Sequence, residues 1–112
     1  MATTDLRNVI SPGCGTTETT LLSTTVTKYA VILGFNIANV TEDAIRVSAK
    51  IVDDDSLAAV WLFKDVEILP GCSLVACGGD QKFNMYFQQS LTVVSDTDDS
   101  ADVLVSYSEI TP

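Results

Sequence analysis

Apolar and polar residues alternate with a period of two over short stretches of this 112-residue chain, and this alternation is its strongest constraint on fold. Successive side chains of a β-strand point to opposite faces, so the alternation predicts strands with one buried face. Thirteen Val, seven Ile and thirteen Thr supply 33 of the 112 residues. Such β-branched side chains suit a pleated sheet. The sequence therefore predicts an all-β chain the size of one domain.

We expect about eight short strands with turns every 8–12 residues, and no helix. Eight short strands predict a single two-sheet antiparallel sandwich of jelly-roll type, because one flat sheet cannot cover its own apolar face. Pro70-Gly71 is a strong turn signal, and Gly78-Gly79-Asp80 is expected to close a short strand. The expected strand segments are 19–27, 28–40, 44–52, 57–63, 64–69, 72–77, 82–87, 90–95 and 101–110.

The clearest alternation predicts a hairpin of residues 28–40 and 44–52, joined by a turn at 39–43. In the first strand of this hairpin, one face is expected to hold Tyr29, Val31, Leu33, Phe35 and Ile37. In the second strand, Ile45, Val47, Ala49 and Ile51 are expected to point inward. The predicted core residues, taken across the whole chain, are Phe35, Val47, Leu62 and Val105.

Residues 1–18 show no strand or helix period, and we expect them to form an N-terminal arm outside a sandwich domain of residues 19–112. The arm is either a disordered terminus or a segment that orders on a neighbouring subunit. In the second case Val9 and Ile10 anchor it, and deleting residues 1–17 leaves a folded domain. The candidate interface residues are Val9, Ile10, Thr20, Leu22 and Thr24, the last three from the Thr-rich strand.

Fifteen acidic and six basic residues give a net charge of −9, and the basic residues are scattered. Such a surface repels phosphate groups, so binding to nucleic acid or to an anionic membrane is not expected. The N-terminus lacks the pattern of a signal peptide, and the longest apolar run, residues 29–35, is too short to span a bilayer. The acidic balance serves solubility or suits a basic partner surface.

The chain has no histidine, which excludes Ser-His-Asp and Cys-His catalysis and imidazole zinc ligands. We therefore predict no catalytic residue, no metal site and no cofactor. Cys14, Cys72 and Cys77 are an odd number of cysteines for a disulfide framework. Buried reduced thiols are the favoured interpretation, and a bridge between Cys72 and Cys77 across a hairpin is the alternative.

Two carboxylate clusters, residues 53–55 and 96–99, could bind a cation, but neither shows an EF-hand pattern. Adjacent acids in turns are more often solvated and bonded to nearby backbone. Trp61, Tyr86 and Tyr107 could stack on a sugar, but single aromatics in a β-sandwich are more often core or interface anchors.

Several segments in order along the chain carry a family resemblance. They are Tyr29-Ala-Val-Ile-Leu-Gly-Phe-Asn-Ile-Ala-Asn39, Leu62-Phe-Lys-Asp-Val-Glu-Ile-Leu-Pro-Gly-Cys-Ser73, Gly78-Gly79-Asp80-Gln-Lys82, Leu91-Thr-Val-Val-Ser95 and Asp102-Val-Leu-Val-Ser-Tyr-Ser-Glu-Ile110. From Tyr29 to Ile110 the chain resembles the small β-sandwich structural proteins of tailed-bacteriophage virions. It departs from that pattern where Gln88-Gln89-Ser90 replaces an expected Gly-Asp turn.

The resemblance implies a non-enzymatic virion structural protein made in the bacterial host cytoplasm. Its most specific form is a capsid cement, or decoration, protein that stabilises the shell, with a homotrimer favoured. The implied partners are other copies of the chain and the major capsid protein or a neighbouring virion protein. A neck, tail or baseplate component is the alternative within this class. A carbohydrate-binding module is the alternative from another class, and it would need Trp61 and Tyr86 exposed and coplanar.

Overall fold

The computed structural model describes residues 2–77 and 82–112, and in them the chain forms nine β-strands and no helix. The expected turn at Gly78-Gly79-Asp80 lies outside the described residues. The strands are β1 (Thr3–Cys14), β2 (Thr19–Ser23), β3 (Tyr29–Asn39), β4 (Ile45–Asp53), β5 (Ala59–Ile68), β6 (Ser73–Cys77), β7 (Phe83–Met85), β8 (Gln89–Ser95) and β9 (Ala101–Thr111). The described residues contain no helix long and apolar enough to cross a membrane.

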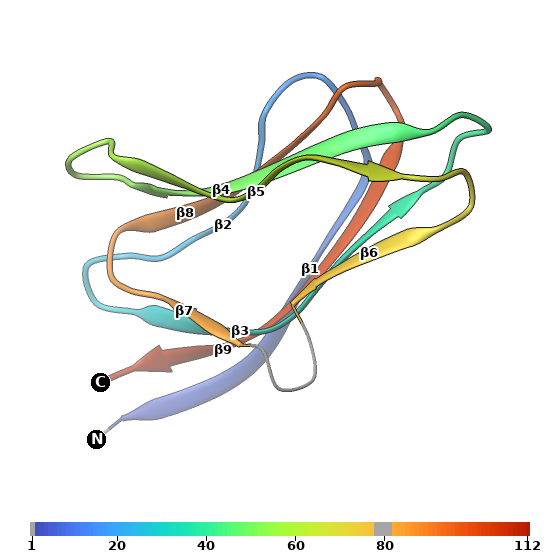
Figure 1. The fold of residues 1–112 in the computed structure, drawn as a ribbon. Helices are drawn as coiled ribbons and strands as arrows, with labels where there is room; N and C mark the ends of the chain where they lie inside the picture. Colours follow the sequence, from blue (N-terminus) through green and yellow to red (C-terminus); the bar gives the residue numbers. More distant parts are fainter. Residues whose placement is uncertain (1, 78–81) are drawn as a thin grey trace.

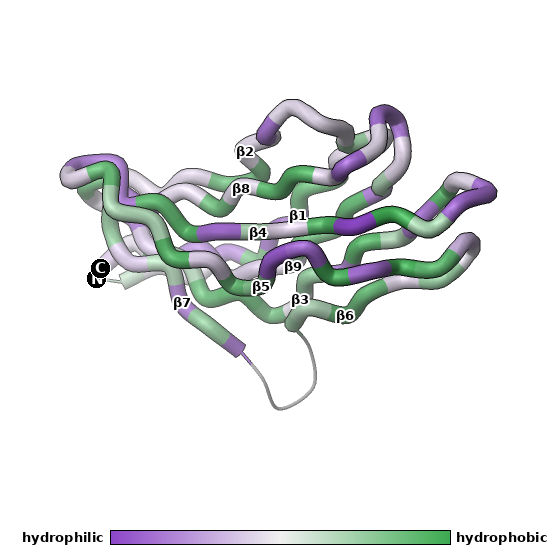
Figure 2. The backbone as a smooth tube through the Cα atoms, turned by 45° about the horizontal axis from the view of Figure 1, so that its top comes forward, coloured by the Kyte–Doolittle hydropathy of each residue, from purple (hydrophilic) through white to green (hydrophobic). Residues whose placement is uncertain are grey.

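The strands form two antiparallel sheets packed face to face, which confirms the predicted sandwich (Figure 1). Sheet I has the order β1-β9-β3-β6, and β7 also pairs with β3. Sheet II has the order β2-β8-β4-β5. The chain passes from one sheet to the other at nearly every connection, which is the topology of a jelly roll. Hydrophilic residues gather in the turns at the ends of the sandwich (Figure 2).

The predicted hairpin of residues 28–40 and 44–52 is wrong, because β3 and β4 lie in different sheets. The turn between them carries the chain across the sandwich, so that each strand buries its apolar face against the opposite sheet. The hairpin within sheet II is instead β4–β5. Two expected segments, 57–63 and 64–69, merge into the single strand β5, which contains register shifts where it pairs with β4.

The N-terminal segment is not an arm outside the sandwich. Residues 3–14 form β1, which pairs with β9 from Thr3 opposite Thr111 to Cys14 opposite Ala101. No boundary separates residues 1–18 from the rest of the domain in the described residues, as the course of β1 beside β9 in Figure 1 shows. The sequence concealed this strand because β1 is at a sheet edge, where backbone hydrogen bonds hold it and few of its side chains reach the core.

A β-bulge in β3 reverses which side chains face the core. Ala30 and Ile32 are buried before the bulge, and Phe35 and Ile37 are buried after it. The register against β9 shifts between Ile32 and Gly34, so the chain contains one extra residue there. The predicted single face is therefore correct for its second half and wrong for its first half, where Tyr29 and Val31 point outward.

The core lies between the two sheets and contains three of the four predicted residues. Phe35, Val47 and Val105 are at most 1% exposed, but Leu62 is 39% exposed. The neighbouring residue Phe63 packs against the core instead, with its ring 6.1 Å from that of Phe35. The prediction for Leu62 fails because the register shifts in the β4–β5 pairing change which residues of β5 point inward.

The predicted turns at 39–43 and Pro70-Gly71 lie together at one end of the sandwich. Asn39 is 2% exposed, and its amide nitrogen donates to the carbonyl oxygens of Asp43 and Ile68 at 2.8 and 2.9 Å. Gly71 has φ of 73°, the left-handed conformation that the predicted turn requires, and its nitrogen donates to the Asn39 carbonyl. These bonds join the end of β3 to the β5–β6 turn.

The cysteines agree in part with the predicted buried thiols. Cys14 and Cys77 are buried, whereas Cys72 is exposed in the β5–β6 turn. The Cys77 thiol donates to the carbonyl oxygen of Ile32 at 3.6 Å. The alternative bridge between Cys72 and Cys77 is not formed in the structure.

Candidate interaction surface

The outer side of sheet I is a broad surface on which no strand among residues 2–77 and 82–112 packs. Val9 and Arg7 lie opposite the buried residues Val105 and Tyr107, so the alternate residues of β1 point outward. We call this surface the neutral face. Its members are Thr4, Leu6, Asn8 and Ile10 of β1, Asp102, Leu104, Ser106, Ser108 and Ile110 of β9, Tyr29, Val31, Gly34, Asn36 and Ala38 of β3, Ser73 and Val75 of β6, and Asn84 of β7.

Large apolar side chains on the neutral face are open to solvent. Leu6 is 80% exposed, Ile10 is 73% exposed, Val75 is 68% exposed and Leu104 is 42% exposed. Of the strand residues that form the face, only Asp102 is charged, in a chain with 21 charged residues. Exposed apolar side chains gathered on a surface with so little charge are typical of an interaction site.

The strand register arranges the neutral face in rows that cross the sheet. One row contains Ile10, Leu104, Asn36 and Val75, from four neighbouring strands. The next row contains Asn8, Ser106 and Gly34, of which Ser106 has a short side chain and Gly34 has none. The row beyond contains Leu6, Ser108, Val31 and Asn84. A low row of small residues therefore separates two rows that carry larger side chains.

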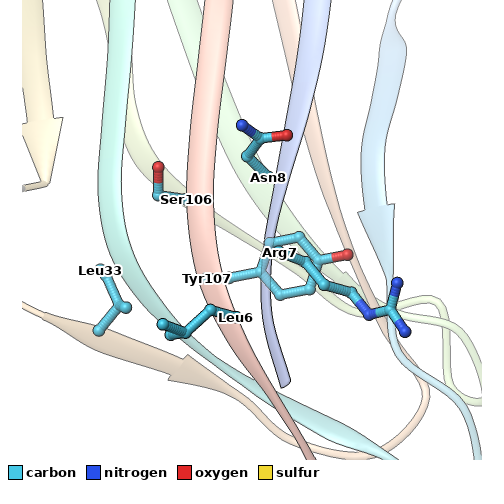
Figure 3. Close-up of a pocket in the computed structure, with 6 residues that line it drawn as sticks. All are labelled: Leu6, Arg7, Asn8, Leu33, Ser106 and Tyr107. Atoms are coloured by element: carbon cyan, nitrogen blue, oxygen red, sulfur yellow. The ribbon is translucent and has the colours of Figure 1, made fainter.

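A shallow hollow lies in this low row, at the β3 bulge. Leu6, Asn8, Leu33 and Ser106 line it together with Arg7 and Tyr107. Figure 3 shows Leu6 and Leu33 on one side, and Arg7 pointing away from them. The hollow exists because Gly34 lacks a side chain and Ser106, directly opposite it, has a short one. Burial raises the pKa of the Tyr107 hydroxyl, and nearby Glu109 adds to this shift while Arg7 opposes it.

The outer side of sheet II has a different character, because charged side chains pair with one another across it. Lys50 Nζ lies 2.8 Å from Glu18 Oε2, and Arg46 lies 3.8 Å from Glu67. The ammonium groups of Lys50 and Lys64 lie 5.2 and 5.1 Å from the centre of the Trp61 ring. Three of the six basic residues are thus engaged on this sheet with partners from the same chain.

The aromatic residues proposed for sugar stacking do not form one platform. Trp61 belongs to β5 of sheet II and has the two lysines over its ring. Tyr86 follows β7 of sheet I and packs against Phe87 and Tyr29, with ring centres 4.7 and 6.3 Å away. Tyr107 is only 7% exposed. The structure gives no support to a flat aromatic binding surface in the described part of the chain.

The five predicted interface residues do not form one surface. Ile10 lies on the neutral face, whereas Val9 points inward and packs against the core. Thr20 is exposed on sheet II, but Leu22 and Thr24 are buried in their own domain. Sequence reasoning missed Leu6, Leu104 and Val75. Leu6 lies in a segment that showed no period, and the strand register is what places Leu104 and Val75 on the outer side of the sheet.

The two acidic clusters lie in turns at opposite ends of the sandwich and bond to nearby groups. Asp53 accepts hydrogen bonds from the backbone nitrogens of Asp55 and Ser56, at 3.0 and 3.4 Å. The Asp96 carboxylate accepts a hydrogen bond from the backbone nitrogen of Arg46 at 3.1 Å. Among the described residues, no group of three Cys, Asp or Glu side chains is placed to hold a metal ion. These contacts fit the interpretation of both clusters as structural turns.

Asp98 links the β8–β9 turn to the β1–β2 loop. Its Oδ1 accepts from the backbone nitrogen of Thr16 at 3.0 Å and from the Thr16 hydroxyl at 2.8 Å. These two bonds, the backbone one first, lower the pKa of the Asp98 carboxyl below its ordinary value. A carboxyl with a lowered pKa in the folded state stabilises the fold above its unfolded pKa, and this contribution is lost as pH falls through the folded pKa.

We therefore expect Asp98→Ala to lower the melting temperature slightly at neutral pH. The difference from the unsubstituted protein should shrink as pH falls below the ordinary carboxylate range, because protonation of Asp98 removes the same contribution. Melting curves from pH 7 to pH 2 measure this. A control, Asp55→Ala in the β4–β5 turn, should show no comparable convergence. A difference that stays constant down to pH 2 would contradict the assigned bonds.

No protein-family model and no curated protein sequence matches this chain. Solved structures resemble it in fold. A pilus structure of Bacillus endospore appendages has a TM-score of 0.58 at 9% identity, covering 98% of this chain and 88% of that chain. An infectious bursal disease virus particle has a TM-score of 0.57 at 9% identity, and the match covers 96% of this chain and 31% of the viral chain. The D431N mutant VP2 protein of that virus has a TM-score of 0.56 at 10% identity, and the match covers 96% of this chain and 32% of the VP2 chain.

The chain thus spans most of the pilus protein and about a third of the viral chains. At these identities the likeness concerns the fold alone. It shows that this β-sandwich occurs in proteins that build pili and virus particles. The fold comparison does not depend on the sequence segments that carry the family resemblance.

Proposed function

We propose that this chain is a non-enzymatic structural protein of a virus particle, and in its most specific form a capsid cement protein of a tailed bacteriophage. It would be made in the bacterial cytoplasm and incorporated into the virion. The observation that carries the proposal is the neutral face, a large surface on a small acidic sandwich whose strand residues include one charged side chain, Asp102. A folded module with one such face is suited to assembly with other protein surfaces.

The fold and the sequence support the same class of function. The likeness to pilus and capsid proteins indicates that this architecture serves in large assemblies. The segment from Leu62 to Ser73, which carries part of the resemblance to phage structural proteins, forms the end of β5, a left-handed turn at Gly71 and the start of β6. A strand, a turn and a second strand in this segment support the proposal.

Contact with the shell would use the acidic ends of the sandwich rather than a free arm. Residues 3–14 are occupied in β1, so they cannot extend from the domain as a free arm without leaving the sheet. The turns at 53–56 and 96–100 carry exposed carboxylates that suit basic patches on a major capsid protein or another virion protein. The sequence favours a trimer, and the number of copies stays a prediction.

Co-sedimentation tests the proposal. The purified full-length chain is mixed with capsids, and separately with tails, from particles that lack it. We expect saturable binding to capsids that weakens as salt is raised, because exposed opposite charges are screened by salt. Binding to tails alone would favour the neck, tail or baseplate alternative. Binding to neither would overturn a virion structural role.

A further inference from the structure

We propose that a second copy of this chain covers the neutral face, with the two neutral faces packed against each other across a two-fold axis. The inference deepens the proposed structural role, on which it rests, by naming the partner of this face, and it predicts a pair in place of the trimer that the sequence favoured. Its support is the size, the charge and the shape of the surface.

The size of the neutral face is that of a stable protein interface. Strands β1, β9 and β3 have 12, 11 and 11 residues, and β6 and β7 supply 5 and 3 residues at the fourth position. With a rise of about 3.3 Å per residue and strands about 4.8 Å apart, the face has roughly 650 Å². Stable protein pairs bury about 800 Å² on each partner. Because β1 pairs with β9 from Thr3 to Cys14, the exposed side chains of Leu6 and Ile10 lie midway along one edge of this area.

Charge decides where two copies can meet, and it favours contact between the two neutral faces. Each copy carries a net charge of −9, so two copies repel each other wherever their acidic turns approach. On the neutral face the charged strand residue is Asp102, at one end of β9, where its carboxylate accepts from the Gly13 nitrogen at 2.9 Å. Packing this face against the ion pairs of sheet II would remove charges from water without new partners, which is costly.

The shape of the face is self-complementary. The row that contains Ile10, Leu104 and Val75 stands beside the low row of Asn8, Ser106 and Gly34. A two-fold axis that runs parallel to the rows, between the low row and its neighbour, sets the larger side chains of one copy over the low row of the other. Neutral groups such as Asn8, Asn36 and Ser106 can then form hydrogen bonds across the interface and define its register.

Analytical ultracentrifugation of the full-length chain tests the pair. Over a concentration series we expect a species with twice the 12.0 kDa mass of one chain. The double variant Leu6→Asp/Ile10→Asp should raise the dissociation constant by about a hundredfold or more, since it places carboxylates in an interface that offers them no partner. Both side chains point to solvent in a single copy, so the variant should keep the circular dichroism and melting curve of the parent.

The matched control is Leu57→Asp/Val60→Asp. Leu57 and Val60 are 75% and 67% exposed, close to the values for Leu6 and Ile10, but they lie in the β4–β5 turn and in β5 of sheet II. The control makes the same chemical changes away from the neutral face. We expect it to pair as strongly as the unsubstituted chain.

Three outcomes overturn the proposal. A chain that stays monomeric to about 1 mM, where pairing would contribute only about 4 kcal/mol, has no stable pair. A trimer excludes face-to-face pairing, because two identical faces close on each other. A dimer that persists in the Leu6→Asp/Ile10→Asp variant uses another surface. Co-sedimentation separates this result from the proposed function, since a monomer can still bind capsids and a dimer can fail to bind them.

Discussion

Deletion of residues 1–17 is expected to unfold the domain. The deletion removes β1, which pairs with β9 along almost its whole length, and also removes the inward side chains of Val9 and Cys14. Strand β9 would become a sheet edge, and the buried residues Val103, Val105 and Tyr107 would lose the strand beside them. The result should be an insoluble product, or one without a cooperative melting transition.

Circular dichroism and thermal melting of the truncated chain measure this effect. A matched control removes only residues 1 and 2, which precede β1, and should melt like the full chain. The sequence alone predicted the opposite result, a folded domain left after removal of an arm. A soluble truncated protein with a cooperative transition near that of the parent would show that β1 is dispensable.

Phe35→Ala is expected to destabilise the domain by roughly 3–5 kcal/mol. Phe35 is 1% exposed in the centre of β3, and its ring lies 6.1 Å from that of Phe63 in the opposite sheet. Removing it leaves a cavity between the sheets that close-packed neighbours cannot fill. Since small domains are stable by only about 5–15 kcal/mol, this is a large share of the total.

Leu62→Ala is the control for the Phe35 experiment. The sequence predicted both residues in the core, but Leu62 is 39% exposed at the outside of β5. We expect the control to cost at most about 1 kcal/mol, as for surface substitutions. Urea unfolding of both variants, compared by their midpoints at equal m-values, measures the difference. If both variants lost the same free energy of unfolding, the assigned register of β3 or β5 would be wrong.

The alternation of apolar and polar residues in the sequence was sufficient to predict the fold class and many of the core residues. The inward positions of β4, from Ile45 to Ala49, follow the period of two directly, and they are buried as predicted. The expected strands in the second half of the chain also correspond to observed strands, apart from the merger into β5. These features depend on side chains of one strand facing a common interior, which a local pattern can report.

The candidate site was less accessible to sequence reasoning. Ile10 was predicted at an interface because it was an isolated apolar residue in a polar segment, and it does lie on the neutral face. Leu104 was not singled out, because an apolar residue in a strand is ordinarily assigned to the core. Only the pairing of Ile10 with Leu104 shows that both point away from the core.

The sequence by itself determined that this chain forms short antiparallel strands, closes them at predictable turns and buries residues such as Val47 and Val105. The tertiary structure alone decided that residues 3–14 are a strand, that β3 and β4 lie in different sheets, and that the bulge near Leu33 reverses the faces of β3. The physical reason is that strand pairing joins backbone groups distant in the chain. Those hydrogen bonds form with almost any side chain, so an edge strand, a crossover or a bulge leaves little trace in local hydrophobic periodicity.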